Sequence, residues 1–345
     1  MSTLSYCDLF CGCGGFSLGF KQEGFKHLGG IDMDAAACRT YAGNISQHVL
    51  NLDITETHSR EFQALAGERP DIVIASPPCE GFSVANQKRE QDPYVRLYDQ
   101  EGRGHLTILA IDWICDLDPK IGFIIENVPV LAQHPTRDFI QDELERIGYK
   151  DVYFNMIYAD RLGAPARRPR VFISNIKFST WPDEEFAENE EEDGDAANVD
   201  GEVLGKYKRT VWDAIGDLPD PTSIHDIPDH DFVSVQGRKE NEISALRWKD
   251  SLVQFDSADG RSKNSWIRLH PWKLSPIVMG KSVFIHPFED RQITVREMAR
   301  LQGFPDDFAF SGTIYEKRNQ VGEAVSPIVS RYLARIIKER QARDV

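Results

Sequence analysis

Short apolar runs separated by amphipathic segments dominate the first half of the chain. Residues 71–75 and 121–125 are short, apolar and rich in β-branched side chains. Such runs predict strands that are buried on both faces of a parallel sheet. Similar runs occur at 4–10, 27–32, 152–157 and 171–174. The pattern therefore predicts an α/β fold.

Helical patterns lie between and after these runs. Residues 106–117 carry apolar side chains at helical spacing, and residues 136–148 end in a glycine. A capping box opens a further helix at Thr294, and Ser326 followed by Pro327 opens the last one. Strands that alternate with helices are typical of a mostly parallel sheet.

The alternation stops between residues 181 and 265, where charged residues, Asp-Pro turns and isolated aromatic residues take over. We expect a separate small region here. Within it, residues 183–202 contain eleven Asp or Glu and no Lys or Arg. This composition predicts a solvated, mobile loop.

Those eleven acids account for most of the net charge of −15. The charge therefore does not exclude a nucleic-acid partner, because DNA affinity depends on where the cations lie. No apolar run reaches the roughly 18 residues of a membrane span, and no signal peptide is evident. The six cysteines lack the spacing of a disulfide framework, which predicts a reducing compartment.

Two candidate chemical groups follow predicted strands. Cys79 comes after residues 71–75, and Pro77 and Pro78 stop that strand. Ligands of open α/β sheets bind at this end of the strands. The alternative is a small buried cysteine beside a turn. Glu126 stands at the tip of the next apolar run, where a carboxyl group is costly unless it is paired or used.

The glycine-rich turn after the first strand would let backbone approach a ligand closely. A dinucleotide fingerprint would need glycine where Ser17 stands, so NAD is not indicated. Cys11 and Cys13 have no second Cys or His pair nearby, so we expect no metal. Asp32 ends the second strand and could bind ribose hydroxyls or cap a helix, although Asp34 is the better cap.

Three further features each have a functional and an ordinary interpretation. Asp53 could accept a hydrogen bond from an adenine amine or be a surface acid. Residues 86–104 could form a loop that closes over a substrate or a disordered insertion. The arginines at 167, 168 and 170 place a cluster of guanidinium groups at the entrance of a predicted strand, which could serve a function or be an ordinary basic surface turn.

The order of these pieces resembles the cytosine-5 DNA methyltransferases from end to end. The blocks are Asp8-Leu-Phe-x-Gly-x-Gly-Gly-Phe16, Pro77-Pro-Cys79, Glu126-Asn-Val128, Arg168-x-Arg170, residues 294–305 and Gln320-Val-Gly322. The resemblance implies a doubly wound, mostly parallel, seven-stranded Rossmann-like domain that binds S-adenosylmethionine. It also implies that residues 1–178 and 284–345 form the catalytic domain, with an inserted target-recognition domain at 179–283.

The resemblance assigns a role to each site residue. It implies that Cys79, Glu126, Arg168 and Arg170 are catalytic. It implies that the cofactor-binding residues are Phe10, Gly12, Cys13, Gly15, Asp32, Met33, Asp53, Ile54, Pro78, Glu323 and Val325. The expected substrate is double-stranded DNA, and the expected enzyme is a cytoplasmic, nucleoid-associated monomer with a cognate restriction endonuclease as a candidate partner.

In the implied reaction, the Cys79 thiolate adds to carbon 6 of a flipped cytosine, and carbon 5 takes the methyl group. Glu126 would hydrogen-bond ring nitrogen 3 and the exocyclic amine, assisted by Arg168. Cations such as Arg168 would lower the pKa of the Cys79 thiol. Ser83, Gln87 and Arg96 are candidates to fill the gap in the duplex or to contact phosphates.

Two departures from the family pattern stand at Ala166, where Gln is usual, and at Glu323, where Asn is usual. Two rival functions stay open. The first is the same chemistry on tRNA, which the long segment 181–265 and the lack of a Cys-Phe-Thr tripeptide disfavour. The second is a non-catalytic, cofactor-sensing DNA-binding partner, which has no need of Cys79, Glu126 and Arg168 together.

Overall fold

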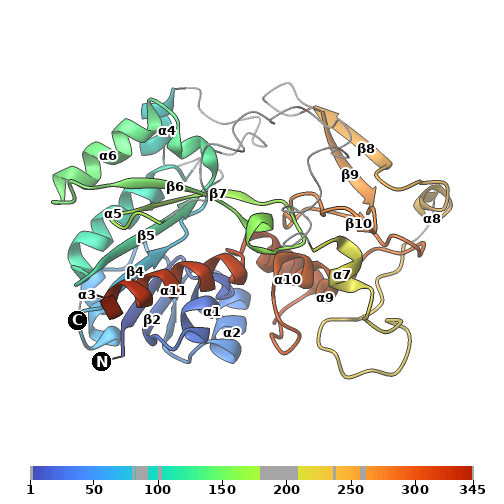
Figure 1. Cartoon of the computed structure of the whole chain (residues 1–345), viewed down its shortest axis with the longest axis horizontal. Coiled ribbons are helices and arrows are strands. Elements are labelled where there is room, and N and C mark those ends of the chain that lie inside the picture. The colour runs from blue at the N-terminus through green and yellow to red at the C-terminus, as the bar shows by residue number, and fades with distance from the viewer. Residues whose placement is uncertain are drawn as a thin grey trace.

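A seven-stranded sheet organises the computed structural model, which describes residues 3–79, 82, 92–99, 103–178, 209–235, 238–256 and 262–343. The strands are β1 (Ser5–Leu9), β2 (Lys26–Asp32), β3 (Val49–Asn51), β4 (Ile72–Ala75), β5 (Gly122–Asn127), β6 (Tyr153–Tyr158) and β7 (Pro169–Ser174). They lie in the order β3-β2-β1-β4-β5-β7-β6 (Figure 1). Strand β7 is antiparallel to both of its neighbours, and the other pairs are parallel. The predicted seven-stranded, mostly parallel α/β fold is confirmed.

Helices cover both faces of this sheet, which makes it doubly wound as predicted. The helices are α1 (Gly15–Gln22), α2 (Ala35–Asn44), α3 (Ser59–Ala66), α4 (Pro93–Tyr98), α5 (His105–Leu117), α6 (Thr136–Arg146), α7 (Val211–Ile215), α8 (Arg238–Ile243), α9 (Val295–Gln302), α10 (Ile314–Glu323) and α11 (Pro327–Arg343), with 3-10 turns η1 (Pro129–Ala132) and η2 (Ala159–Leu162). Successive strand residues point to opposite faces. Cys7 and Leu9 of β1 therefore pack with α3, α5 and α6, while Tyr6 packs with α1 and α11.

The chain runs outward from β1 to β3 on one side and from β4 to β5 on the other. The switch between the two directions lies between β1 and β4, which pair directly. Ligands of doubly wound sheets bind at the carboxyl ends of the strands at such a switch. The glycine-rich turn after β1 and the Pro-Pro-Cys segment after β4 both lie at this place.

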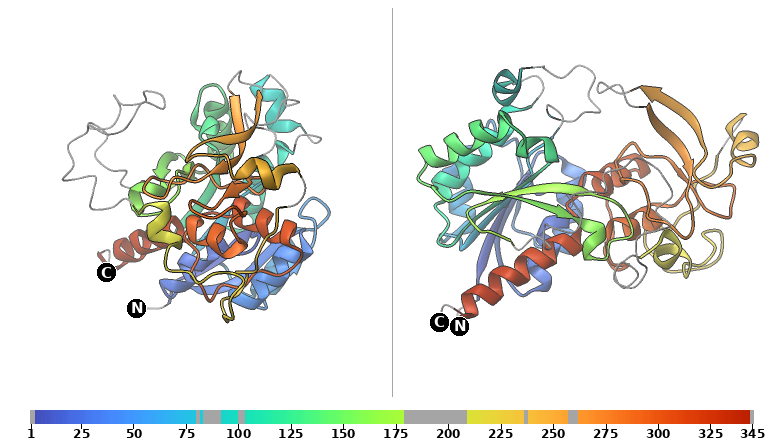
Figure 2. Two further views of the ribbon diagram at one scale, coloured as in Figure 1. Left: turned by 90° about the vertical axis from the view of Figure 1, so that its right-hand side faces the viewer. Right: turned by 45° about the horizontal axis from the view of Figure 1, so that its top comes forward.

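A smaller unit lies to one side of the large sheet (Figure 2). It contains α7, α8 and a three-stranded sheet of β8 (Ser251–Asp256), β9 (Ser262–Arg268) and β10 (Phe284–Ile285) in the order β10-β9-β8. Helix α7 packs on α9 through Val211, Ala214 and Met298. The domain boundaries stay a prediction; β10 begins at the first residue of the predicted second catalytic segment. The acidic segment 183–202 lies outside the described residues.

The polar segment 86–104, predicted as a loop, contains helix α4. Asp92 precedes Pro93, and its carboxyl group accepts a long hydrogen bond of 3.4 Å from the N–H of Val95. An acid followed by proline is a common helix start, and Leu97 anchors the helix in the core. Ser83, Gln87 and the side chain of Arg96 lie outside the described part of the chain.

Among the residues that the structure describes, no helix is both long and apolar enough to cross a lipid bilayer.

Candidate active site

The ends of β4 and β5 bring a hydroxyl and a carboxyl group together. Ala75 of β4 pairs with Ile125 of β5, so the next residues of the two strands are also neighbours. The hydroxyl of Ser76 donates to Oε2 of Glu126 at 2.7 Å. Glu126 is only 6% exposed, so this contact satisfies an oxygen that has little access to water.

Cys79 is held by its backbone just beyond this pair. The side-chain amide of Asn127 donates to the carbonyl of Pro77 at 3.2 Å, which ties the proline segment to β5. The carbonyl of Cys79 accepts from the N–H of Phe82, whose side chain is fully buried in the core. Cys79 is a free, partly exposed thiol, and Pro78 beside it is also partly exposed. The arrangement presents a free thiol on a fixed backbone.

The second oxygen of Glu126 is held from β7. Because β7 runs antiparallel to β5, the first residues of β7 lie beside the last residues of β5. Nε of Arg170 lies 3.0 Å from Oε1 of Glu126, and 16% and 7% of the two side chains are exposed. Both oxygens of the carboxyl group thus have a partner, one from the end of β4 and one from the start of β7.

Arg168 lies nearby, but its guanidinium group donates hydrogen bonds to backbone carbonyls and not to Glu126. Its two terminal nitrogens donate to the carbonyls of Val278 at 2.8 Å and Ala324 at 2.9 Å. The side chain is 4% exposed, and burial lowers its pKa to about 9, with Arg170 acting in the same direction. Arg168 therefore joins two distant segments, whereas the direct partner of Glu126 is Arg170.

Burial raises the pKa of the Cys79 thiol above its ordinary value. The guanidinium groups of Arg170 and Arg168 act in the opposite direction, and the carboxylate of Glu126 adds to the rise. The net direction is opposite to the one expected from the sequence, because burial outweighs the two cations. The free protein therefore holds Cys79 mainly as a thiol near neutral pH.

The other half of the site is the turn after β1. The N–H of Gly12 donates to Oδ2 of Asp32 at 2.8 Å, and the N–H of Asp34 donates to Oδ1 of the same carboxyl group. Gly12 has a φ of +51°, and no atom lies within 4 Å of the position its Cβ would occupy. Phe10, two residues earlier, also has a positive φ, of 56°. The turn therefore faces open space, with a carboxyl group at its side.

The start of α1 is closed by a segment from the other end of the chain. A Cβ on Gly15 would lie 2.4 Å from the carbonyl oxygen of Val325, so only glycine allows this approach. The thiol of Cys13 donates to the carbonyl of Gln320 at 3.5 Å. Glu323 stands exposed at the end of α10, two residues before Val325.

The remaining cofactor candidates follow β2 and β3. Met33 is 59% exposed beside Asp32, and Ile54 is buried. One oxygen of Asp53 accepts from the N–H and the hydroxyl of Thr55, and these bonds lower the pKa of Asp53. That oxygen is thus occupied by the protein's own turn.

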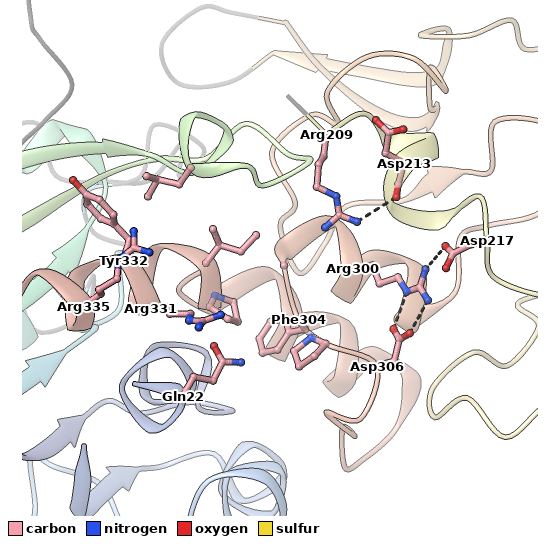
Figure 3. Close-up of a pocket in the computed structure, with 15 residues that line it drawn as sticks. Gln22, Arg209, Asp213, Asp217, Arg300, Phe304, Asp306, Arg331, Tyr332 and Arg335 are labelled. Atoms are coloured by element: carbon pink, nitrogen blue, oxygen red, sulfur yellow. Dashed lines mark hydrogen bonds and ion pairs between the residues drawn. The ribbon is translucent and has the colours of Figure 1, made fainter. Parts of the chain in front are cut away.

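A groove of about 670 Å³ lies elsewhere, among residues of α1, α7, α9 and α11 (Figure 3). Among its arginines, Arg300 pairs with Asp306 and Asp217, and Arg331 pairs with Glu23. None of the predicted catalytic or cofactor-binding residues lines this groove.

Comparison with known proteins identifies the family of the chain. The family profile described as C-5 cytosine-specific DNA methylase matches residues 4–339. The chain belongs to that family. The protein M.MjaORF1200P of Methanocaldococcus jannaschii is 37% identical to this methylase over 389 aligned residues, which cover 97% of the chain and 98% of the relative. The type II methyltransferase M1.HphI of Haemophilus parahaemolyticus is 31% identical, covering 99% of the chain and 88% of the relative.

Solved structures share the fold of the methylase. The crystal structure of the S. pombe Dnmt2 methyltransferase superposes with a TM-score of 0.62 at 17% sequence identity, covering 98% of this chain and 99% of that one. A prophage-encoded E. coli protein gives a TM-score of 0.69 at 23% identity, covering 98% and 99%. These identities support the fold alone.

Sequence reasoning missed two features of the methylase's site. It left Ser76 without a role, although a polar residue directly after a buried strand and beside an acidic strand tip is a usable signal. It gave Arg168 the assisting role, and only the register of β5 and β7 shows Arg170 beside Glu126. The departure at Ala166 lies buried, in a bridge with Ser275 of the smaller unit.

Proposed function

We propose that this methylase methylates carbon 5 of cytosine in double-stranded DNA at a specific short sequence, with Cys79 as the nucleophile. One observation supports this most directly. Cys79 lies within electrostatic reach of Glu126, Arg170 and Arg168, and both oxygens of Glu126 are fixed in place. A type II relative that is 31% identical over nearly the whole chain supports DNA as the substrate.

The glycine-rich half of the site fits S-adenosylmethionine. Gly12 faces open space, Asp32 presents a carboxyl group suited to ribose hydroxyls, and the exposed Met33 offers an apolar surface to adenine. Phe10, Cys13, Gly15 and Val325 would shape the pocket, and Asp53, Ile54, Pro78 and Glu323 would border it. When bound, this cofactor supplies the methyl group that carbon 5 receives.

The residues after β4 and β5 would act on the cytosine ring. The Cys79 thiol must lose its proton before it adds to carbon 6, and Arg170 and Arg168 favour the thiolate. Glu126 would face ring nitrogen 3 and the exocyclic amine, held in that orientation by Ser76 and Arg170. A stacked cytosine cannot reach a thiol at a strand end, so the base must leave the duplex.

The smaller unit would recognise the target sequence. Residues 179–283 would form this recognition domain, and residues 1–178 and 284–345 would form the catalytic domain. Side chains that reach base edges supply such specificity. We further propose that the enzyme acts as a cytoplasmic monomer beside a cognate restriction endonuclease. A particle mass near 39.2 kDa by light scattering, and protection of methylated DNA from that endonuclease, would support these points.

Bisulfite sequencing of genomic DNA from cells that express this chain tests the proposal. We expect cytosines in one short motif to resist conversion, and cells that express Cys79→Ala to show no protection. Methyl label in tRNA but not DNA would instead make RNA the substrate. Cofactor binding without labelling of either would indicate a non-catalytic DNA-binding protein.

A further inference from the structure

We propose that Ser76 is a positioning residue for Glu126, whose hydroxyl keeps hold of that carboxyl group whether or not the carboxyl carries a proton. The inference rests on the proposed function, in which Glu126 contacts the cytosine ring. Ser76 itself reaches the ring through Glu126 only. Three observations support it: the fixed backbone of Ser76, the low exposure of Glu126, and the different chemistry of the two groups that hold it.

Backbone hydrogen bonds fix the position of Ser76 relative to Glu126. The N–H of Ser76 donates to the carbonyl of Leu9 at 3.1 Å, which extends the pairing of β4 with β1 by one residue. Pro77 follows Ser76 and restricts its backbone conformation. The carbonyl of Pro77 in turn accepts a hydrogen bond from the side-chain amide of Asn127. The hydroxyl is therefore delivered to Oε2 of Glu126 from a fixed position, at 2.7 Å.

The two partners of Glu126 differ in what they can accept. A guanidinium group has donors only, so Arg170 favours an ionised carboxyl group. A serine hydroxyl both donates and accepts, and it rotates to suit its partner. If Glu126 takes up a proton while it binds cytosine, Arg170 loses part of its attraction, whereas Ser76 keeps its hydrogen bond. Ser76 thus allows the carboxyl group to change charge without changing place.

Replacing Ser76 removes a hydrogen bond from a carboxyl group with 6% exposure. We expect Ser76→Ala to lower kcat by about tenfold or more, because a bond to a charged group is lost. The KM for DNA and for S-adenosylmethionine should change little. The charged groups that face Glu126 are Arg170, Arg168 and Cys79. These groups are unchanged in Ser76→Ala, so a loss of kcat reports on the missing hydroxyl.

The experiment compares the wild-type chain with Ser76→Ala, Ser76→Thr and a matched control. Ser59→Ala is the control, because the Ser59 hydroxyl also donates to a carboxyl group, that of Asp116, at 2.6 Å on the surface. We expect Thr, which keeps the hydroxyl, to restore kcat, and the control to match the wild type. Equal losses in the Ala and Thr variants at unchanged melting temperature would overturn the inference. So would an unchanged kcat in Ser76→Ala.

A failure of the proposed function is distinguishable from a failure of this inference. In the first case the wild-type chain transfers no methyl group to DNA, so kinetics cannot report on Ser76. Urea unfolding of Ser76→Ala, Glu126→Gln and the double variant then forms a cycle. Changes in the free energy of unfolding that are clearly non-additive would support the contact between Ser76 and Glu126. Strictly additive changes would overturn the inference.

Discussion

The candidate active site has two halves that are held together by different kinds of contact. In the half around the turn after β1, which we call the backbone half, most contacts involve backbone: the N–H of Gly12 donates to Asp32, and Gly15 allows the Val325 carbonyl to approach. In the half at the ends of β4 and β5, which we call the side-chain half, side chains make the contacts, since Ser76 and Arg170 hold Glu126. The backbone half should therefore be damaged by added atoms, and the side-chain half by removed ones.

The largest effect is expected on the side-chain half, from Arg170→Ala. The change leaves the buried Glu126 carboxylate without its cation and removes the larger of the two guanidinium effects on Cys79. Loss of a preorganised donor at an active site typically costs about 100-fold or more in rate, so kcat/KM should fall by roughly that factor. Methyl-transfer kinetics measure it.

Arg167→Ala is the matched control for that change, because Arg167 is exposed one residue before Arg168. It should keep most of the wild-type rate constant. If both variants lose activity to the same extent, general loss of positive charge explains the result, and the Glu126 pairing does not.

On the backbone half, Gly15→Ala should destabilise the protein by about 1–3 kcal/mol, because the new methyl group would lie 2.4 Å from the carbonyl oxygen of Val325. Urea unfolding measures it. Gly43→Ala is the matched control: Gly43 lies inside α2 with no atom within 4 Å of its Cβ position. That variant should gain about 0.5–1 kcal/mol from lower chain entropy. Equal effects at the two positions would contradict the close approach of Val325.

The thiol gives a pH test of the side-chain half. Burial raises the pKa of Cys79, so the thiolate is the minor form at neutral pH and increases about tenfold per pH unit below that pKa. Alkylation of Cys79 by iodoacetamide should rise accordingly between about pH 7 and 8.5. Mass spectrometry separates it from the exposed Cys115, and a rate already constant at pH 7 would show an ionised thiol.

The smallest effect is expected from Met33→Ala on the backbone half. Met33 is 59% exposed, so an adenine ring could cover only about half of a side chain whose full burial is worth about 1.5–3 kcal/mol. The dissociation constant for S-adenosylmethionine should rise about fivefold by calorimetry. An increase of 100-fold or more would mean that side chains, and not backbone, dominate this half as well.

The sequence predicted the features that depend on local patterns, and it missed contacts between residues far apart in the chain. The apolar runs identified β4 and β5, because a strand buried on both faces has little freedom in composition. The glycine-rich turn and the Pro-Pro-Cys segment are local signals and were found. The partner of Glu126 was not, because Arg170 reaches it only through the antiparallel register of β5 and β7, which joins residues 44 positions apart.

Helices α4 and α10 are among the elements that were missed, for a different reason. Thr313 and Glu316 form a capping box that opens α10, but no apolar period follows to draw attention to it. Helix α4 starts at Asp92-Pro93 inside an otherwise polar segment. The fold of the smaller unit could not be predicted, because its third strand, β10, is only two residues long and joins β9 in parallel after a connection of 15 residues.

The packing of the last helix on the first has a consequence for synthesis of the protein. A Cβ on Gly19 of α1 would lie 2.1 Å from the backbone nitrogen of Arg331 of α11, and the Ser330 hydroxyl donates to the carbonyl of Phe16. The start of α1 is therefore packed by a segment that follows 314 positions later. A nascent chain on the ribosome cannot complete this packing until α11 has emerged.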